Sequence, residues 1–318
     1  MPEIKILAPA KLNLDLQIGE KQLDGFHGIK SIFLALDYGD IIKMKISPSE
    51  HEKPCIEIKM NWHISNPGGI PEDIPEIPEI PIEENLVFRA ISQFKSYTSC
   101  DFSVFAEIDK HLPPGGGLGG GSSDAASTLM ALNKLVSTEK TPLKKEELIE
   151  IGSSLGSDVP FFLLNTTAAF VSGRGEKVKA LRLPNSFYKL SFLLVNPGIP
   201  CNTASVYNLL DNWRHEKNFI QNDRLFTPEQ LLQVFSASPS TWPFYNDFLP
   251  LFQADNNYIK IFESLKSLGA EFSGLSGSGS TCFGVFTDYK KALKAKKILS
   301  KQWPLAVLTS VAATIQFV

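Results

Sequence analysis

The segment that decides the fold runs from Pro113 to Asp124 and reads PPGGGLGGGSSD. Six of the chain's 22 glycines stand between Gly115 and Gly121, interrupted only by Leu118. Glycine costs conformational entropy on folding, so a run this dense indicates that the backbone must approach something closely. The residues before the run alternate apolar and polar as a strand does, and those after it repeat apolar side chains at helical spacing.

A strand, a glycine loop and a helix in this order form an anion-binding unit. The loop presents unpaired backbone N–H groups, and the start of the helix adds the positive end of its dipole. Phosphate is the commonest anion bound in this way. Ser122 and Ser123 add hydroxyl groups, and Asp124 suits a helix N-terminus. A flexible linker is the alternative, but linkers usually lack a strong helix start directly after them.

Two known phosphate-binding fingerprints fit this loop poorly. A Walker A loop needs a lysine after its last glycine, and a serine stands there instead. Gly115, Gly117 and Gly120 match the GxGxxG spacing of a dinucleotide site, and Glu139 lies about twenty residues further on. Glu139 falls in a polar segment between two expected helices rather than after a second strand, which argues against that site.

Length and composition indicate a soluble enzyme. The chain has 318 residues, enough for one large or two ordinary domains. Its net charge of −3 lacks the basic excess typical of nucleic-acid binding. Four scattered cysteines without a CxxC argue against a zinc site and against a disulfide framework. The start of the chain contains neither a signal peptide nor a membrane span, so we expect a cytoplasmic protein that binds neither nucleic acid nor membrane.

Extended segments dominate the first part of the chain. We expect strands over 4–7, 12–18, 31–36 and 40–46. Lys11, Asn13 and Asp15 alternate with apolar residues and therefore share one strand face. The sequence DGFH at 24–27 predicts a turn that presents an aromatic ring and an imidazole.

A proline-rich tract interrupts this pattern over 61–84. Prolines at 71, 75, 78 and 81 exclude helix and interior strand, so we expect a surface excursion in extended polyproline II conformation without a catalytic part. We assign a structural role to Trp62, His111 and Trp242. Asp158 follows a helix that we expect to end at Gly156, a position that commonly places a carboxylate at the mouth of a cleft.

The rest of the chain alternates helices and strands. Helices are expected over 85–94 and 125–136, from a start at 141–142 to 155, around 203–207, from 227, over 255–268 and from 288. Strands are expected over 187–195, 281–286 and 306–318. A second small-residue run, 274–280, precedes one of these strands.

Three segments resemble the motifs of the GHMP kinase superfamily, in the same order and across nearly the whole chain. APAKLNLDL at 8–16 is similar to the first motif, PPGGGLGGGSSDAA to the second and GLSGSGSTCFGVF at 274–286 to the third. Within the superfamily, DGFH, LDYGD, DKHLPPGGGLGGGSSDAA and LGSDVPFF look most like the family of 4-diphosphocytidyl-2-C-methyl-D-erythritol kinases.

This resemblance implies a two-domain α+β fold. Residues 1–180 would form a ribosomal-S5-like, ATP-binding domain that contains the proline-rich excursion 61–84, and residues 181–318 a substrate-binding domain. Lys11 and Asp158 match the catalytic pair of the family. Asp158 would be the general base that takes the proton of the substrate hydroxyl, and Lys11 would hold Asp158 ionised, because an adjacent cation favours a carboxylate.

The resemblance also implies the ligand contacts. The residues expected to bind ATP are Asn85, Lys110, Pro114, Gly115, Gly116, Gly117, Leu118, Gly119, Gly120, Gly121, Ser122 and Ser123. The residues expected to bind the acceptor are Asn13, Phe26, His27, Asp158, Thr203 and Tyr207. Mg²⁺ is expected with ATP; Ser123 is a candidate neighbour of the ion, and no acidic metal ligand can be assigned. His27 would recognise the edge of cytosine, with Phe26 and Tyr207 stacking on the base.

The implied activity is ATP-dependent phosphorylation of the C2 hydroxyl of 4-diphosphocytidyl-2-C-methyl-D-erythritol, in the non-mevalonate route to isoprenoids. The partner would be this small cytidine-diphosphate-linked molecule, and the enzyme a monomer or homodimer. One alternative is another GHMP kinase, for homoserine or phosphomevalonate, which would not need Phe26 and His27 as a nucleobase clamp. The other is a non-catalytic nucleotide-binding module, against which the presence of both Lys11 and Asp158 argues.

Overall fold

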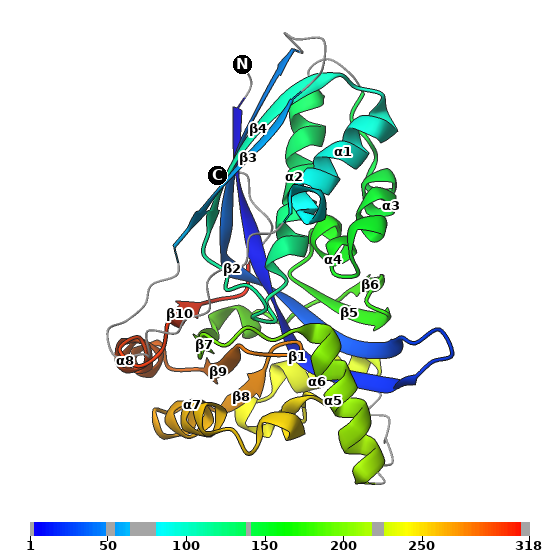
Figure 1. The fold of residues 1–318 in the computed structure, drawn as a ribbon. Helices are drawn as coiled ribbons and strands as arrows, with labels where there is room; N and C mark the ends of the chain where they lie inside the picture. Colours follow the sequence, from blue (N-terminus) through cyan, green and yellow to red (C-terminus); the bar gives the residue numbers. More distant parts are fainter. Residues whose placement is uncertain (1–2, 49–54, 64–80, 138–140, 218–225, 313–318) are drawn as a thin grey trace.

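Two β-sheets with helices packed on them make up the computed structural model, which describes residues 3–48, 55–63, 81–137, 141–217 and 226–312 (Figure 1). The first sheet contains the strands up to residue 180, and the second begins with the strand at residue 191. Helices and strands mix in both halves, as the α+β prediction requires.

The first sheet has six strands in the order β3-β4-β2-β5-β6, with β1 paired to β2. The strands are β1 (Glu3–Lys21), β2 (His27–Pro48), β3 (Ile56–Trp62), β4 (Phe102–Lys110), β5 (Ala168–Gly173) and β6 (Lys177–Ala180). Only β3 and β4 are parallel among these pairs. The short strands that we expected join into two long ones, β1 and β2. The pairing of β1 with β2 continues past its irregularities by register shifts, one of them between Pro9 and Lys11.

Four helices cover one face of this sheet (Figure 1). They are α1 (Leu86–Thr98), α2 (Gly120–Val136), α3 (Lys145–Leu155) and α4 (Val159–Leu164), and a 3₁₀ turn (Ile82–Glu84) precedes α1. The prediction that α3 starts at 141–142 is wrong. Asn133 hydrogen-bonds both the N–H and the carbonyl of Leu143, at 2.7 and 3.0 Å, and α3 begins only after this tethered residue.

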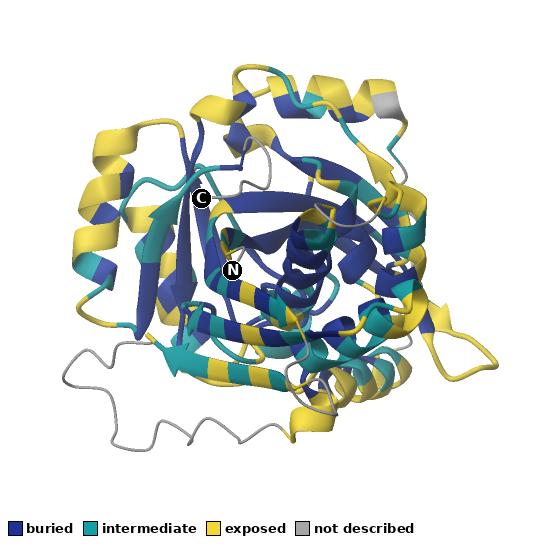
Figure 2. Ribbon diagram, turned by 90° about the horizontal axis from the view of Figure 1, so that it is seen from above, coloured by how far each residue is buried: buried dark blue, intermediate teal, exposed yellow. Residues whose placement is uncertain are grey.

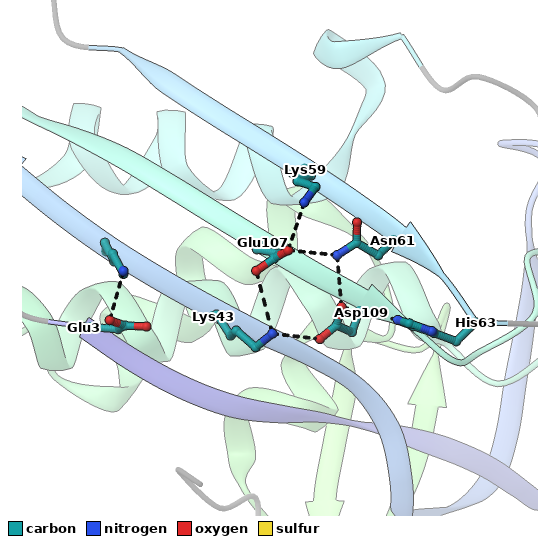
Figure 3. A network of polar contacts seen from close by, with 8 residues as sticks. Glu3, Lys43, Lys59, Asn61, His63, Glu107 and Asp109 are labelled. Atoms are coloured by element: carbon teal, nitrogen blue, oxygen red, sulfur yellow. Dashed lines mark hydrogen bonds and ion pairs between the residues drawn. The ribbon is translucent and has the colours of Figure 1, made fainter.

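The opposite face of β2, β3 and β4 carries a network of charged side chains (Figure 3). Lys43 lies 3.1 Å from Asp109 and 3.7 Å from Glu107, and Asn61 donates to both carboxylates. Such a network keeps this face of the sheet hydrated and leaves the helical face to form the core.

The second sheet has four antiparallel strands in the order β10-β7-β9-β8. Its strands are β7 (Ser191–Asn196), β8 (Phe272–Leu275), β9 (Cys282–Phe286) and β10 (Leu305–Thr309). Its helices are α5 (Thr203–Glu216), α6 (Pro228–Ser236), α7 (Asn256–Ser267) and α8 (Tyr289–Leu299), with 3₁₀ turns at Phe187–Lys189, Pro239–Thr241 and Leu249–Phe252. Two expected strands are therefore shorter: residues 187–189 form a turn before β7, and β10 ends at Thr309. Residues 313–318 of the expected last strand lie outside the described residues.

The two sheets share a hydrophobic core. One cluster of buried side chains joins Leu12 and Leu34 of the first sheet to Phe192, Leu194 and Phe283 of the second. Buried positions gather between the layers, whereas exposed positions line the outer helices (Figure 2). This shared core holds the two halves in a fixed relation around the site. The domain division near residue 180 itself stays a prediction.

The proline-rich tract begins later than we expected. Asn61 and Trp62 end strand β3, so they do not belong to an excursion, and residues 81–84 already lead into α1. Residues 64–80 lie outside the described part of the chain.

Candidate active site

A cavity of about 1040 Å³ brings together residues from both halves of the chain. All but one of the site residues predicted from the sequence line it: Lys11, Asn13, Phe26, His27, Asn85, Lys110, Pro114, Gly115, Gly116, Gly117, Leu118, Gly119, Gly120, Gly121, Ser122, Asp158, Thr203 and Tyr207. The exception is Ser123, which is fully buried and does not line the cavity. Positions that are almost two hundred residues apart in sequence therefore meet in one space.

The glycine loop is fixed by its carbonyl groups. Four consecutive carbonyls accept hydrogen bonds: Gly115 from the N–H of Cys201 (3.1 Å), Gly116 from that of Thr281 (3.2 Å), Gly117 from the Ser276 hydroxyl (2.8 Å) and Leu118 from the N–H of Lys11 (2.9 Å). Three of these donors belong to the second half of the chain. The N–H of Gly116 donates to the carbonyl of Pro113 at 3.2 Å. The bonded carbonyls hold the loop in one conformation, in which its other N–H groups can bind an anion in the cavity.

Glycine is required at Gly117 for two separate reasons. Its φ of 72° lies in the left-handed region, which side chains with a Cβ rarely adopt. A Cβ here would also stand 2.1 Å from the carbonyl oxygen of Ser276 and 2.7 Å from that of Gly279. The second small-residue run thus packs directly against the glycine loop.

Ser276 connects all three sequence motifs. Its hydroxyl donates to the carbonyl of Gly117 at 2.8 Å and accepts from the N–H of Asn13 at 3.2 Å. One side chain of the third motif therefore holds the glycine loop beside β1. We assigned Ser276 no role from the sequence, although it stands in the second small-residue run and in the third motif.

Lys11 and Asp158 form an ion pair in the cavity. The ammonium of Lys11 lies 3.4 Å from Oδ2 of Asp158, donates to Oδ1 of Asn13 at 2.6 Å and stands 4.6 Å from the ring centroid of Phe33. The Lys11 side chain is 7% exposed and that of Asp158 is 26% exposed. Lys11 is therefore held on three sides, while the carboxylate remains open to a hydroxyl group in the cavity.

Lys110 is buried between two carboxylates. Its ammonium donates to Asp124 at 2.6 Å and pairs with Asp40. Burial alone would lower the pKa of Lys110, but Asp124 and Asp40 outweigh it and raise this pKa. Burial raises the pKa of Asp124. The expectation that Asp124 caps a helix is wrong, because α2 already begins at Gly120 and the carboxylate binds Lys110 instead.

Trp62 lines the cavity beside Lys110 and Asn85. The register of β3 and β4 pairs Trp62 with Lys110, whose ammonium lies 5.7 Å from the Trp62 ring centroid. Asn85 caps α1 by accepting from the N–H of Val87 at 2.9 Å. We had assigned Trp62 a structural role. The alternation of Ile58, Met60 and Trp62 could have shown that a strand continues to this residue.

His27 lies at the other end of the cavity, where the β1–β2 hairpin meets α5. Its Nδ1 is 2.9 Å from the carbonyl oxygen of Gly19, and its ring stacks on Tyr207 with centroids 5.0 Å apart and planes at 26°. Burial raises the pKa of the Tyr207 hydroxyl to about 12. Tyr207 thus lines the cavity with His27 on one side of its ring, and its contact with the acceptor stays a prediction.

Phe26 is the exposed member of this end. It is 55% exposed, and the guanidinium carbon of Arg174 lies 4.2 Å from its ring centroid. Arg174 also pairs with Asp24 of the hairpin turn. Thr203, the first residue of α5, places its hydroxyl 3.1 Å from that of Ser278.

Asp15 does not line the cavity, unlike Lys11 and Asn13, with which the sequence pattern grouped it. It is 3% exposed, and its Oδ1 accepts from the N–H of Tyr245 at 2.8 Å. Among the described residues no group of three or more His, Cys, Asp or Glu side chains could hold a metal ion. No helix in the described ranges is both long enough and apolar enough to cross a membrane.

Comparison with family models gives two matches. Residues 85–166 match the GHMP kinases N-terminal domain, and residues 255–305 match the GHMP kinases C-terminal region. The first match contains the glycine loop and Asp158, and the second contains the small-residue run with Ser276.

Two relatives cover almost the whole chain. A protein of Mannheimia succiniciproducens is 34% identical over 296 residues, which are 93% of this chain and 83% of the relative. One of Burkholderia pseudomallei is 32% identical over 308 residues, covering 96% and 92%. Both are named 4-diphosphocytidyl-2-C-methyl-D-erythritol kinase.

Solved structures share the fold. A crystal structure of 4-(cytidine 5'-diphospho)-2C-methyl-D-erythritol kinase is similar with a TM-score of 0.72 and 27% identity, covering 97% of this chain and 99% of that one. Homoserine kinase from Cytophaga hutchinsonii is similar with a TM-score of 0.67 at 16% identity, covering 99% and 96%. The second likeness concerns the fold alone, which is the two-domain kinase fold predicted from the motifs.

Proposed function

The chain belongs to the GHMP kinases and, within them, to the group of relatives named 4-diphosphocytidyl-2-C-methyl-D-erythritol kinase; from this premise we propose that it phosphorylates the C2 hydroxyl of that cytidine-linked substrate with ATP. One observation carries the proposal. A single cavity joins an anion-binding glycine loop, the pair Lys11 and Asp158, and an aromatic end with His27. This shared cavity supports a mechanism in which the phosphate donor, the general base and the nucleobase contact lie close together.

The loop N–H groups and the start of α2 bind and orient the phosphates of ATP. Asp158 accepts the proton of the acceptor hydroxyl as the oxygen attacks the γ-phosphorus, and ADP leaves with the electron pair of the broken P–O bond. Lys11 holds the carboxylate at 3.4 Å and adds positive charge where negative charge develops. Positioning and charge neutralisation are the main requirements of phosphoryl transfer, and these residues supply both.

Mg²⁺ fits this site as an ion carried mainly by the nucleotide. Such ions are commonly held by one or two carboxylates together with substrate phosphates, so a cluster of three acidic residues is not needed. Ser122, Asp124 and Asp158 are among the residues with side-chain oxygens that line the cavity near the loop, and they could hold the ion. The ion would neutralise charge on the phosphates. Ser123 is too buried to be its neighbour.

The acceptor end favours a base-bearing substrate. Phe26 offers an exposed ring, Tyr207 a half-buried one, and His27 lies against it. Aromatic faces suit a nucleobase. Homoserine and phosphomevalonate have no ring to place here, which disfavours the alternative kinases. The open carboxylate of Asp158 beside Lys11 disfavours a non-catalytic module.

The test is an assay of ATP consumption with three acceptors: 4-diphosphocytidyl-2-C-methyl-D-erythritol, homoserine and phosphomevalonate. We expect turnover with the first alone and a product phosphorylated at C2. Equal or greater turnover with either other acceptor would refute the assignment. ATP binding by calorimetry without turnover on any acceptor would favour the non-catalytic module.

A further inference from the structure

We propose that Asp211 is a positioning residue for the acceptor end and sets the affinity for the nucleobase-bearing substrate through His27. This inference rests on the proposed function, in which His27 contacts the base. Asp211 does not itself line the cavity, but His27 and Lys21, which it contacts, do. Its effect on the substrate must therefore pass through the imidazole.

Helix α5 presents one stripe of side chains to the β1–β2 hairpin. Tyr207, Asp211 and Arg214 are spaced by four and three residues and so lie on one helix face. Oδ1 of Asp211 lies 3.2 Å from Nε2 of His27, and Oδ2 lies 3.4 Å from the ammonium of Lys21. Both contacts tie the helix to the two strands that flank the hairpin turn.

Three contacts hold the His27 ring. Nδ1 lies 2.9 Å from the carbonyl oxygen of Gly19, Nε2 lies 3.2 Å from the carboxylate of Asp211, and one ring face stacks on Tyr207. A rotation of the ring by 180° would place C–H groups against these two oxygens. The contact with Asp211 therefore favours one orientation of the ring and leaves the other ring face to the substrate.

The other charged groups near this ring are already engaged. Arg214 donates to the carbonyls of Ile18 at 2.8 Å and Gly19 at 3.1 Å and lies 3.2 Å from Asp247. Lys21 faces Asp211 rather than the ring. Within the described part of the chain, Asp211 is thus the carboxylate in direct contact with His27. Removal of its charge would leave His27 without its carboxylate neighbour.

The kinetic test is Asp211→Asn, which keeps the size of the side chain and removes its charge. The amide oxygen of asparagine can still accept but carries no full charge, so the contact with His27 becomes weaker. We expect KM for the cytidine-linked substrate to rise about tenfold, which corresponds to about 1.4 kcal/mol. The kcat and the KM for ATP should change less than about twofold, since the phosphate end is untouched. Glu216→Gln, an exposed acid at the end of the same helix, is the matched control and should leave all three values unchanged.

Three kinetic outcomes would overturn the proposal. One is an equal rise of KM in Glu216→Gln, which would indicate a general charge effect. Another is a fall of kcat together with a rise of KM for ATP in Asp211→Asn, which would indicate a structural defect. The third is an additive effect of Asp211→Asn in a His27→Ala background, because a residue that acts through His27 should have no effect once the ring is gone.

A spectroscopic test needs no substrate. In the ¹⁵N spectrum of histidine-labelled protein, with His27 assigned from His27→Ala, the signals of Nδ1 and Nε2 report on the two contacts of the ring. Asp211→Asn should change the Nε2 signal of His27 while Glu216→Gln leaves it unchanged. An unchanged Nε2 signal in Asp211→Asn would refute the inference, whatever the substrate. If the cytidine-linked substrate is not phosphorylated, the proposed function fails while this spectrum still decides the role of Asp211.

Discussion

The two ends of the cavity are built in different ways. The phosphate end, defined by the loop 115–122 and Lys110, is held by backbone hydrogen bonds and by a buried ammonium between two carboxylates. The acceptor end, defined by Phe26, His27 and Tyr207, is held by side-chain contacts from α5 and includes a ring that is 55% exposed. One end depends on main-chain geometry and the other on side-chain identity.

Under the proposed function, this difference assigns the chemistry to one end of the cavity and the selectivity to the other. Binding phosphates requires N–H groups at fixed points, which a rigid backbone supplies at little cost when the ligand binds. Selecting an acceptor requires side chains that can be exchanged without moving the loop. Substitutions at the phosphate end should therefore reduce turnover, ATP binding or stability, and those at the acceptor end should change the KM of one substrate.

The largest effect is expected for Asp158→Asn, at the point where the two ends meet. The amide keeps the shape of the side chain but cannot accept the proton, so kcat should fall at least ~10²-fold. The fold and ATP binding should persist, which circular dichroism and calorimetry can check. Near-normal turnover would remove Asp158 from the chemistry.

Gly117→Ala should destabilise the packing of the phosphate end. Strain at a positive φ and contact with the carbonyls of Ser276 and Gly279 should lower the free energy of unfolding by about 2–3 kcal/mol. Gly121→Ala is the matched control: Gly121 lies within α2, and a Cβ there would meet nothing closer than 3.4 Å. Thermal denaturation compares the two variants. Equal stability of both would contradict the close packing of the two small-residue runs.

Trp62→Ala tests whether the phosphate end also contacts the adenine of ATP, separately from its phosphates. If the indole stacks on adenine, its loss should cost about 1–3 kcal/mol, so KM for ATP should rise about tenfold. The KM of the cytidine-linked acceptor should stay constant, and Trp62→Phe should restore most of the affinity for ATP. A rise of the acceptor KM alone would contradict this prediction, because it would assign Trp62 to the acceptor.

The smallest effect is expected for Asp109→Asn, on the sheet face away from the cavity (Figure 3). The hydrogen bond from Asn61, with further contacts to Lys43 and His63, lowers the pKa of Asp109 to about 2. Because the pKa is lower in the folded state, the stabilisation is present above about pH 4 and is lost as the pH falls towards 2. Asparagine should therefore cost about 1 kcal/mol near neutral pH and nothing near pH 2.

Urea unfolding of wild type and Asp109→Asn across this pH range checks the prediction. The kinetic constants of the variant should match those of the wild type, because Asp109 contacts neither end of the cavity. A difference in stability that grows as the pH falls would contradict the assigned sign.

The sequence predicted the parts of the site that lie within short motifs. The glycine loop, its flanking strand and helix, and the turn with Phe26 and His27 follow from local patterns. The pairing of Lys11 with Asp158 came from resemblance rather than from spacing, and the structure places the two side chains 3.4 Å apart. Ser123 was included because it stands in the motif, yet the first turns of α2 bury it.

The missed residues act over long sequence separations. Ser276 reaches Asn13 across 263 positions, and Asp211 reaches a hairpin that lies almost two hundred residues earlier. No local pattern encodes such pairs, because they depend on how the two sheets pack. Trp62 was missed for a different reason: the prolines that follow it obscured the end of a strand.

The central claim is that the acceptor end selects a cytidine-linked substrate while the phosphate end supplies the chemistry. The most direct measurement compares kcat/KM for 4-diphosphocytidyl-2-C-methyl-D-erythritol with that for 2-C-methyl-D-erythritol 4-phosphate, which has the same hydroxyl but no cytidine. We expect a loss of at least ~10²-fold without the cytidine moiety, with an unchanged KM for ATP. Equal kcat/KM for the two acceptors would contradict the account.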